Sequence, residues 1–112
     1  VVDAAMNDLP RPAMYQAFHQ IVPVQQRPAS PVTYDVVGPI CESGDWLGRD
    51  RDLAVQPGDL LAVLSAGAYC MSMASTYNSR GRAAEVLIAD GQAHLVAPRE
   101  SVRDIYQRER LL

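Results

Sequence analysis

With 112 residues, the chain has the size of one domain and can bury a single hydrophobic core without disulfides or a metal. Its formal net charge is -3 and its ten arginines form no basic run, which argues against nucleic acid as a partner. No stretch approaches the roughly 20 consecutive apolar residues that span a membrane, and no signal peptide is recognisable, so we expect no membrane partner.

Two residue types bear on compartment and completeness. The only cysteines, Cys41 and Cys70, favour free thiols in the reducing cytoplasm, because a secreted chain this short usually carries more cysteines. A single disulfide between them is the alternative. The chain also contains no lysine and does not begin with Met, which suggests a piece of something larger.

The first elements are a short helix and a short strand. The segment 11–20 (RPAMYQAFHQ) predicts a helix with Asp8 as a possible N-cap and Pro10 or Pro12 in the first turn. The segment 20–25 (QIVPVQ) is typical of a short strand whose proline suggests an edge position.

The middle of the chain alternates between apolar and irregular segments. Residues 32–40 (VTYDVVGPI) predict a strand, and 41–59 (CESGDWLGRDRDLAVQPGD) predict a long irregular connection that ends in a turn at Pro57 and Gly58. The continuous apolar run 60–67 (LLAVLSAG) indicates a strand buried on both faces.

The last third contains the clearest unit. Two apolar runs in 82–99 flank Asp90 and Gly91, a strong signal for a two-residue hairpin, and 100–112 predict a terminal helix. Residues 68–79 fit either a short helix or a tight irregular segment. The sum is a mainly β fold, an antiparallel sandwich or open Greek-key barrel with two or three short helices.

Arg11 and Tyr15 are spaced i, i+4, so on a helix they share one face. An arginine fork beside a phenol hydroxyl can bind a carboxylate. The structural alternative is a solvated arginine whose stem packs on a tyrosine.

Cys41 and Glu42 stand side by side where a strand is expected to end, and strand ends and their loops often carry functional sites. Glu42 disfavours a thiolate next to it, so Cys41 is no obvious nucleophile. The alternative is a buried small residue followed by an exposed acid.

Tyr69 and the segment 77–80 (YNSR) are further candidates, with a core tyrosine and a simple turn as their structural alternatives. His19 and His94 have no acidic or cysteine partner at metal-ligand spacing, so we expect no metal site.

Taken together, four stretches resemble the C-terminal part of the diaminopimelate decarboxylase family in order and spacing, and the resemblance runs from about residue 1 to about residue 110. They are DAAMNDLPRPAMY, VVGPICESGDWLGRDR, GDLLAVLSAGAY and YNSRGRAAEVLI. The departures are small: Cys70 stands where the family often has glycine or alanine, and Gly81 where it often has proline.

The resemblance implies an enzyme that uses pyridoxal 5'-phosphate to convert meso-diaminopimelate to L-lysine and CO2. It implies an N-terminal barrel that holds the cofactor lysine, and a homodimer whose active sites lie between the barrel of one subunit and the β domain of the other. Residues 1–112 would then be the C-terminal β domain without its barrel. The absence of lysine fits this expectation.

The resemblance also implies roles for individual residues. Cys41 and Glu42 would reach into the partner's active site, with Cys41 as the acid that reprotonates the substrate carbon. Glu42 would bind the distal ammonium of the substrate, and Arg11 with Tyr15 its distal carboxylate. Tyr69 would lie against the cofactor and substrate.

Two other functions stay open. In the first, the chain is the β domain of a related ornithine or arginine decarboxylase, whose substrate has no distal carboxylate for Arg11 and Tyr15 to bind. In the second, the chain is a stand-alone dimerisation module without enzymatic activity. A fused aspartate kinase in the parent chain is compatible with each enzymatic interpretation.

Overall fold

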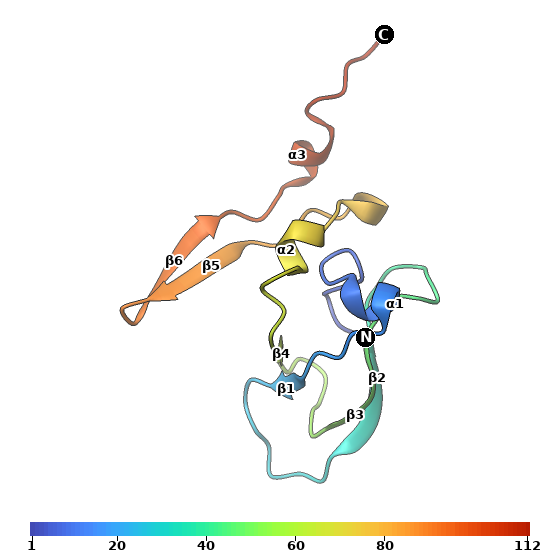
Figure 1. Ribbon diagram of the computed structural model, residues 1–112, viewed down its shortest axis with the longest axis vertical. Coiled ribbons are helices and arrows are strands. Elements are labelled where there is room, and N and C mark those ends of the chain that lie inside the picture. Colours follow the sequence, from blue (N-terminus) through green and yellow to red (C-terminus); the bar gives the residue numbers. More distant parts are fainter.

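The computed structural model describes all 112 residues as six short strands, three α-helices and one 3-10 helix (Figure 1). In chain order these are α1 (Arg11–Tyr15), β1 (Ile21–Pro23), β2 (Val32–Val37), β3 (Trp46–Leu53), β4 (Leu61–Val63), α2 (Cys70–Met73), η1 (Tyr77–Ser79), β5 (Glu85–Ala89), β6 (Gln92–Ala97) and α3 (Val102–Tyr106). The prediction of a mainly β fold with short helices is confirmed. None of the helices has the length and apolar character needed to cross a membrane.

All strand pairs are antiparallel, as predicted. The strands form three two-stranded sheets, β1 with β4, β2 with β3 and β5 with β6, and no closed barrel. The β2–β3 pair is the largest, and the loop of residues 38–45 joins its two strands.

The prediction of an irregular connection over 41–59 is wrong, because the eight-residue strand β3 lies within it. Leu47 and Leu53 are buried at its two ends, and charged residues stand between them. The positive φ of 53° at Asp50 accompanies a shift in register against β2. This irregularity interrupts the simple alternation by which strands are recognised.

The run 60–67 forms a shorter and more exposed strand than predicted. Only Leu61–Val63 pair as β4, with half-buried side chains, while Leu60 is 73% and Leu64 41% exposed. A strand is buried on both faces only where layers cover both faces. Here β4 pairs with β1 alone, so the prediction of burial on both faces is wrong.

Helix α1 is half as long as predicted. It ends at Tyr15 because Gln16 adopts the left-handed conformation, with φ 55°. Pro12 lies in its first turn, as expected, but the N-cap is Pro10. The carboxylate of Asp8 instead accepts a hydrogen bond from a backbone N–H three residues earlier.

The C-terminal hairpin is confirmed. Asp90 and Gly91 have φ values of 51° and 72°, as a type I′ turn between β5 and β6 requires. The following helix α3 begins with a capping box between Ser101 and Asp104. Figure 1 shows that the hairpin and α3 extend away from the other sheets.

The core is small and lies between α1, the β2–β3 pair and the β1–β4 pair. It consists of five buried apolar residues, Leu9, Ile21, Val36, Leu47 and Leu53. Only 13 of 112 residues are buried, and the radius of gyration of 15.8 Å exceeds the roughly 13 Å of a compact domain of about 100 residues. The chain is therefore more open than a self-contained domain of its length.

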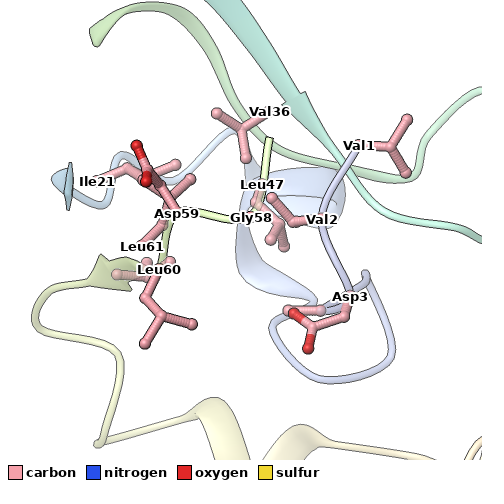
Figure 2. A pocket seen from close by; sticks show the side chains of 12 residues that line it. Val1, Val2, Asp3, Ile21, Val36, Leu47, Gly58, Asp59, Leu60 and Leu61 are labelled. Atoms are coloured by element: carbon pink, nitrogen blue, oxygen red, sulfur yellow. The ribbon is translucent and has the colours of Figure 1, made fainter. Parts of the chain in front are cut away.

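One side of this core opens into an apolar pocket of about 300 Å³ (Figure 2). Figure 2 shows Val1 and Val2 on one side of it and Leu60 and Leu61 on the other. None of the candidate site residues from the sequence lines this pocket. The candidate site residues therefore lie on another part of the molecule.

Candidate active site

Residues 3–8, called the N-terminal turn below, contact each segment that carries a sequence-predicted site residue. The turn closes through a hydrogen bond of 2.9 Å from the Asp8 N–H to the Ala5 carbonyl, and the Asp8 carboxylate accepts from the Ala5 N–H at the same distance. Helix α1 begins at Arg11, after Leu9 and Pro10. Arg11 therefore lies close to the N-terminal turn along the chain.

The loop with Cys41 and Glu42 is attached to this turn by Asp45, which is 3% exposed. Its carboxylate accepts hydrogen bonds from the backbone N–H of Met6 at 2.7 Å and of Ile40 at 2.6 Å. Figure 1 shows this green loop beside α1, at the end of the β2–β3 pair. A buried carboxylate is stable when backbone donors satisfy it, so Asp45 is a structural anchor of the loop. The sequence analysis missed it.

Gly38 makes the close approach possible. A Cβ at this position would lie 2.5 Å from Oδ2 of Asp45 and 2.7 Å from the carbonyl oxygen of Ala4. The glycine also donates its N–H to the Asp45 carbonyl at 3.0 Å. Gly38 is thus needed for the close packing of this loop against Asp45 and Ala4.

Cys41 and Glu42 lie exposed at the tip of this loop. The structural alternative of a buried small residue at position 41 is therefore wrong. Glu42 accepts a hydrogen bond from the hydroxyl of Tyr77, which comes from a segment 35 residues later. The structure therefore joins two motifs that the sequence analysis treated separately.

The Tyr77 segment is itself fixed to the N-terminal turn through Asn7, which is 3% exposed. Arg80 donates from Nε to Oδ1 of Asn7 at 3.0 Å, and the Ser75 N–H donates to the Asn7 carbonyl at 3.0 Å. Asn7 returns a hydrogen bond from Nδ2 to the Ser75 carbonyl at 3.2 Å. The structural alternative of a simple turn is thus incomplete, because hydrogen bonds to Asn7 fix the YNSR segment to the N-terminal turn.

Tyr69 is 52% exposed, so the core-tyrosine alternative is wrong. The Arg11 guanidinium lies over its ring, with Cζ 5.0 Å from the ring centroid. The next residue, Cys70, donates from its thiol to the Asp8 carbonyl at 2.9 Å, and burial raises the pKa of this thiol. Cys70 therefore fixes Tyr69 to the N-terminal turn.

Tyr15 stands on the same short helix as Arg11 and is 59% exposed. Their i, i+4 spacing gives them one helix face, as predicted. Arg11 faces Tyr69, while no hydrogen bond ties the Tyr15 hydroxyl to the rest of the chain. The Tyr15 hydroxyl is therefore available to hydrogen-bond to a ligand.

The side chains limit the cofactor chemistry of these 112 residues. No group of three or more His, Cys, Asp or Glu residues is placed to hold a metal ion. The exposed ring of Tyr69 offers a flat contact surface, but no lysine is present to bond to pyridoxal phosphate. These residues alone do not fit covalent attachment of that cofactor.

Comparison with known proteins defines the class. Residues 1–67 match the family model described as "Pyridoxal-dependent decarboxylase, C-terminal sheet domain". This match covers more than half of the chain, and the chain belongs to this family.

Individual relatives are more specific. The chain is 60% identical over 112 residues to the diaminopimelate decarboxylase of Pseudomonas aeruginosa and 51% identical to that of Vibrio cholerae. The match covers all of this chain and 27% of each relative. The chain thus spans about a quarter of the length of the curated relatives it matches.

A solved structure shows the same fold. The diaminopimelate decarboxylase of M. jannaschii in complex with L-lysine matches with a TM-score of 0.93 at 40% identity. The match covers 98% of this chain and 25% of that one.

Proposed function

We propose that this chain is the C-terminal sheet domain of a cytoplasmic diaminopimelate decarboxylase, which converts meso-2,6-diaminopimelate to L-lysine and CO2. The observation that carries the proposal is that Arg11, Tyr69 and the Cys41–Glu42 pair stand on segments tied to one N-terminal turn. The 60% identity to a decarboxylase of this name supports the substrate.

Pyridoxal 5'-phosphate would supply the electron sink for loss of CO2. The lysine that holds it would come from the remainder of the enzyme, because residues 1–112 contain none. This remainder is the proposed N-terminal barrel. Tyr69 would then contribute its exposed ring to the cofactor side of the site. The chain by itself would be inactive.

The substrate end that does not react carries one ammonium and one carboxylate. The Glu42 carboxylate would bind the ammonium, and the Arg11 guanidinium with the Tyr15 hydroxyl would bind the carboxylate. A site for ornithine or arginine would not need the second pair. Arg11 and Tyr15 therefore favour diaminopimelate over those substrates.

Cys41 would deliver a proton from Sγ to the substrate carbon, in the place that the departing CO2 leaves. Its exposed position on the loop tip lets it approach a substrate bound outside this domain. A thiol next to a carboxylate suits a proton donor better than a nucleophile.

We further propose a homodimer in which Cys41 and Glu42 act in the partner's site. Both side chains are exposed, as residues that complete another subunit's site would be before assembly. The hairpin β5–β6 supports contact with a further part of the enzyme, because its apolar residues Val86, Leu87 and Ile88 are 54–68% exposed. An apolar surface of this kind is typical of an interface.

The direct test uses the purified full-length protein with pyridoxal phosphate and measures CO2 and L-lysine from meso-diaminopimelate. We expect both products in equal amounts, with no comparable turnover of ornithine or arginine. Preferred turnover of ornithine or arginine would move the chain to a related decarboxylase. No turnover of any of the three would favour the dimerisation module.

A further inference from the structure

The hydroxyl of Tyr77 and the carboxylate of Glu42 form the only side-chain hydrogen bond that Glu42 makes in the chain. We propose that Tyr77 is a positioning residue: it holds Glu42 in the orientation that binds the distal ammonium of the substrate. The inference deepens the proposed function and rests on it.

Glu42 needs such support because of where it lies. It stands exposed at the tip of a loop, where a long side chain samples many rotamers. Binding an ammonium from one fixed direction requires one of these rotamers. A hydrogen bond that selects it before the substrate arrives lowers the entropy lost on binding.

Tyr77 is suited to hold Glu42 because its own segment is fixed. Its backbone N–H donates to Oγ of Ser75 at 3.3 Å, and Ser75 is hydrogen-bonded to Asn7 of the N-terminal turn. The same turn holds the Glu42 loop through the hydrogen bond from the Met6 N–H to Asp45. Donor and acceptor are therefore both attached to residues 3–8.

The chemistry of the pair leaves Glu42 able to bind substrate. A phenol has one O–H to donate, so it occupies one lone pair on Oε1 and leaves Oε2 for an ammonium. The hydrogen bond to Glu42 and the negative charge of that carboxylate raise the pKa of the Tyr77 phenol. The phenol therefore keeps its proton and remains a donor at neutral pH.

The test compares Tyr77→Phe with wild type in the full-length enzyme. We expect the KM for meso-diaminopimelate to rise about 3- to 10-fold, with kcat within about twofold, because one hydrogen bond that orients a binding group is lost. Tyr106→Phe is the matched control: it removes a hydroxyl from an exposed tyrosine of α3 that has no role in the site.

Two further measurements separate positioning from a merely structural role. In a Glu42→Ala background, Tyr77→Phe should change KM less than twofold, because the group that it positions is gone. The inhibition constant of 2-aminoheptanedioate, which lacks one ammonium, should also be unaffected by Tyr77→Phe. A structural defect would change this constant as well.

The outcomes distinguish the two proposals. An active wild type whose KM is unchanged by Tyr77→Phe, or an undiminished effect in the Glu42→Ala background, would overturn the role of Tyr77 alone. A wild type that releases no CO2 from meso-diaminopimelate would overturn the proposed function and this role together.

Discussion

The backbone N–H of Met6 donates a hydrogen bond of 2.7 Å to the buried carboxylate of Asp45, 39 residues later in the chain. The other carboxylate oxygen accepts from the Ile40 N–H at 2.6 Å. One side chain thus joins the N-terminal turn, which precedes Arg11, to the loop with Cys41 and Glu42. The relative position of the two proposed substrate-binding groups depends on it.

Asp45→Asn should therefore lower the free energy of unfolding by about 2–3 kcal/mol, since the asparagine NH2 would face a backbone donor in a buried site. The measurement is urea denaturation of the chain, followed by the fluorescence of Trp46, its single tryptophan and the direct neighbour of Asp45. Asp90→Asn is the control, because Asn-Gly suits the hairpin turn as well as Asp-Gly does. Equal stability of the two variants would contradict the anchoring role.

Gly38→Ala tests the same contact from the other side. The added Cβ would come within 2.5 Å of Oδ2 of Asp45 and 2.7 Å of the Ala4 carbonyl oxygen, so the loop has to move. We expect a loss of about 1–3 kcal/mol in stability. Gly44→Ala, in the same loop, meets nothing within 4 Å and should leave the unfolding midpoint nearly unchanged. A Gly38→Ala variant as stable as Gly44→Ala would show that the loop adapts freely.

The elements predicted correctly from the sequence are those with local chemistry. The hairpin turn has positive φ values at Asp90 and Gly91, and the other turn has one at Gly58, where Pro57 fixes the φ of the preceding position. Strand β3 was missed because its charged central residues carry no apolar alternation. Only its pairing with β2 makes it a strand, and pairing between distant segments leaves no local signal.

The site residues likewise fall into those that local motifs predict and those that only the folded chain identifies. Spacing and position along the chain pointed to Arg11, Cys41 and Glu42, which stand in short motifs, and the resemblance suggested their roles. Asn7 and Asp45 were overlooked because the partners that join them to other segments lie far away in the sequence, 39 residues for Asp45 and 68 for Asn7. A buried Asp or Asn between backbone donors and acceptors looks like any polar loop residue until the chain is folded.

The two thiols should differ in reactivity. Cys41 is exposed, whereas Cys70 is half-buried and donates to the Asp8 carbonyl. Burial and then the charges of Asp8 and Glu85 raise the pKa of Cys70, which disfavours its thiolate. At pH 8, iodoacetamide should modify Cys41 first, and Cys41→Ser should abolish the fast phase. Mass spectrometry of digested samples shows the site. Faster modification of Cys70 would contradict the assigned environments.

The ion pair between Arg27 and Asp59 should make stability depend on acid pH. Hydrogen bonds of 2.7 and 2.6 Å from Arg27, with a further one from the Gln56 N–H, lower the pKa of Asp59 from its ordinary 3.8 to about 2. A lowered carboxyl pKa contributes stability that is complete above pH 3.8 and is lost as the pH falls toward 2.

Arg27→Gln should accordingly raise the pKa of Asp59 and remove this contribution. Wild type and variant should differ in unfolding midpoint at pH 5 to 7 and converge near pH 2, while the carboxyl signal of Asp59 in NMR titrations reports its pKa directly. Arg108→Gln, on an arginine outside any ion pair, is the control. A difference that persists undiminished at pH 2 would have another cause than this pair.

Arg11 should determine affinity for the substrate carboxylate. Its guanidinium lies over the exposed ring of Tyr69, 5.0 Å from the centroid, and this stacking orients it before a ligand binds. In the full-length enzyme, Arg11→Ala removes a charged hydrogen-bonding group worth about 1.5–3 kcal/mol, so KM for meso-diaminopimelate should rise roughly 10- to 100-fold. Arg11→Lys should recover little, because an ammonium offers neither the flat stacking surface nor the paired donors of arginine. Arg108→Ala is the control for loss of a surface charge. A KM within twofold of wild type in the Arg11→Ala variant would mean that the distal carboxylate is bound elsewhere.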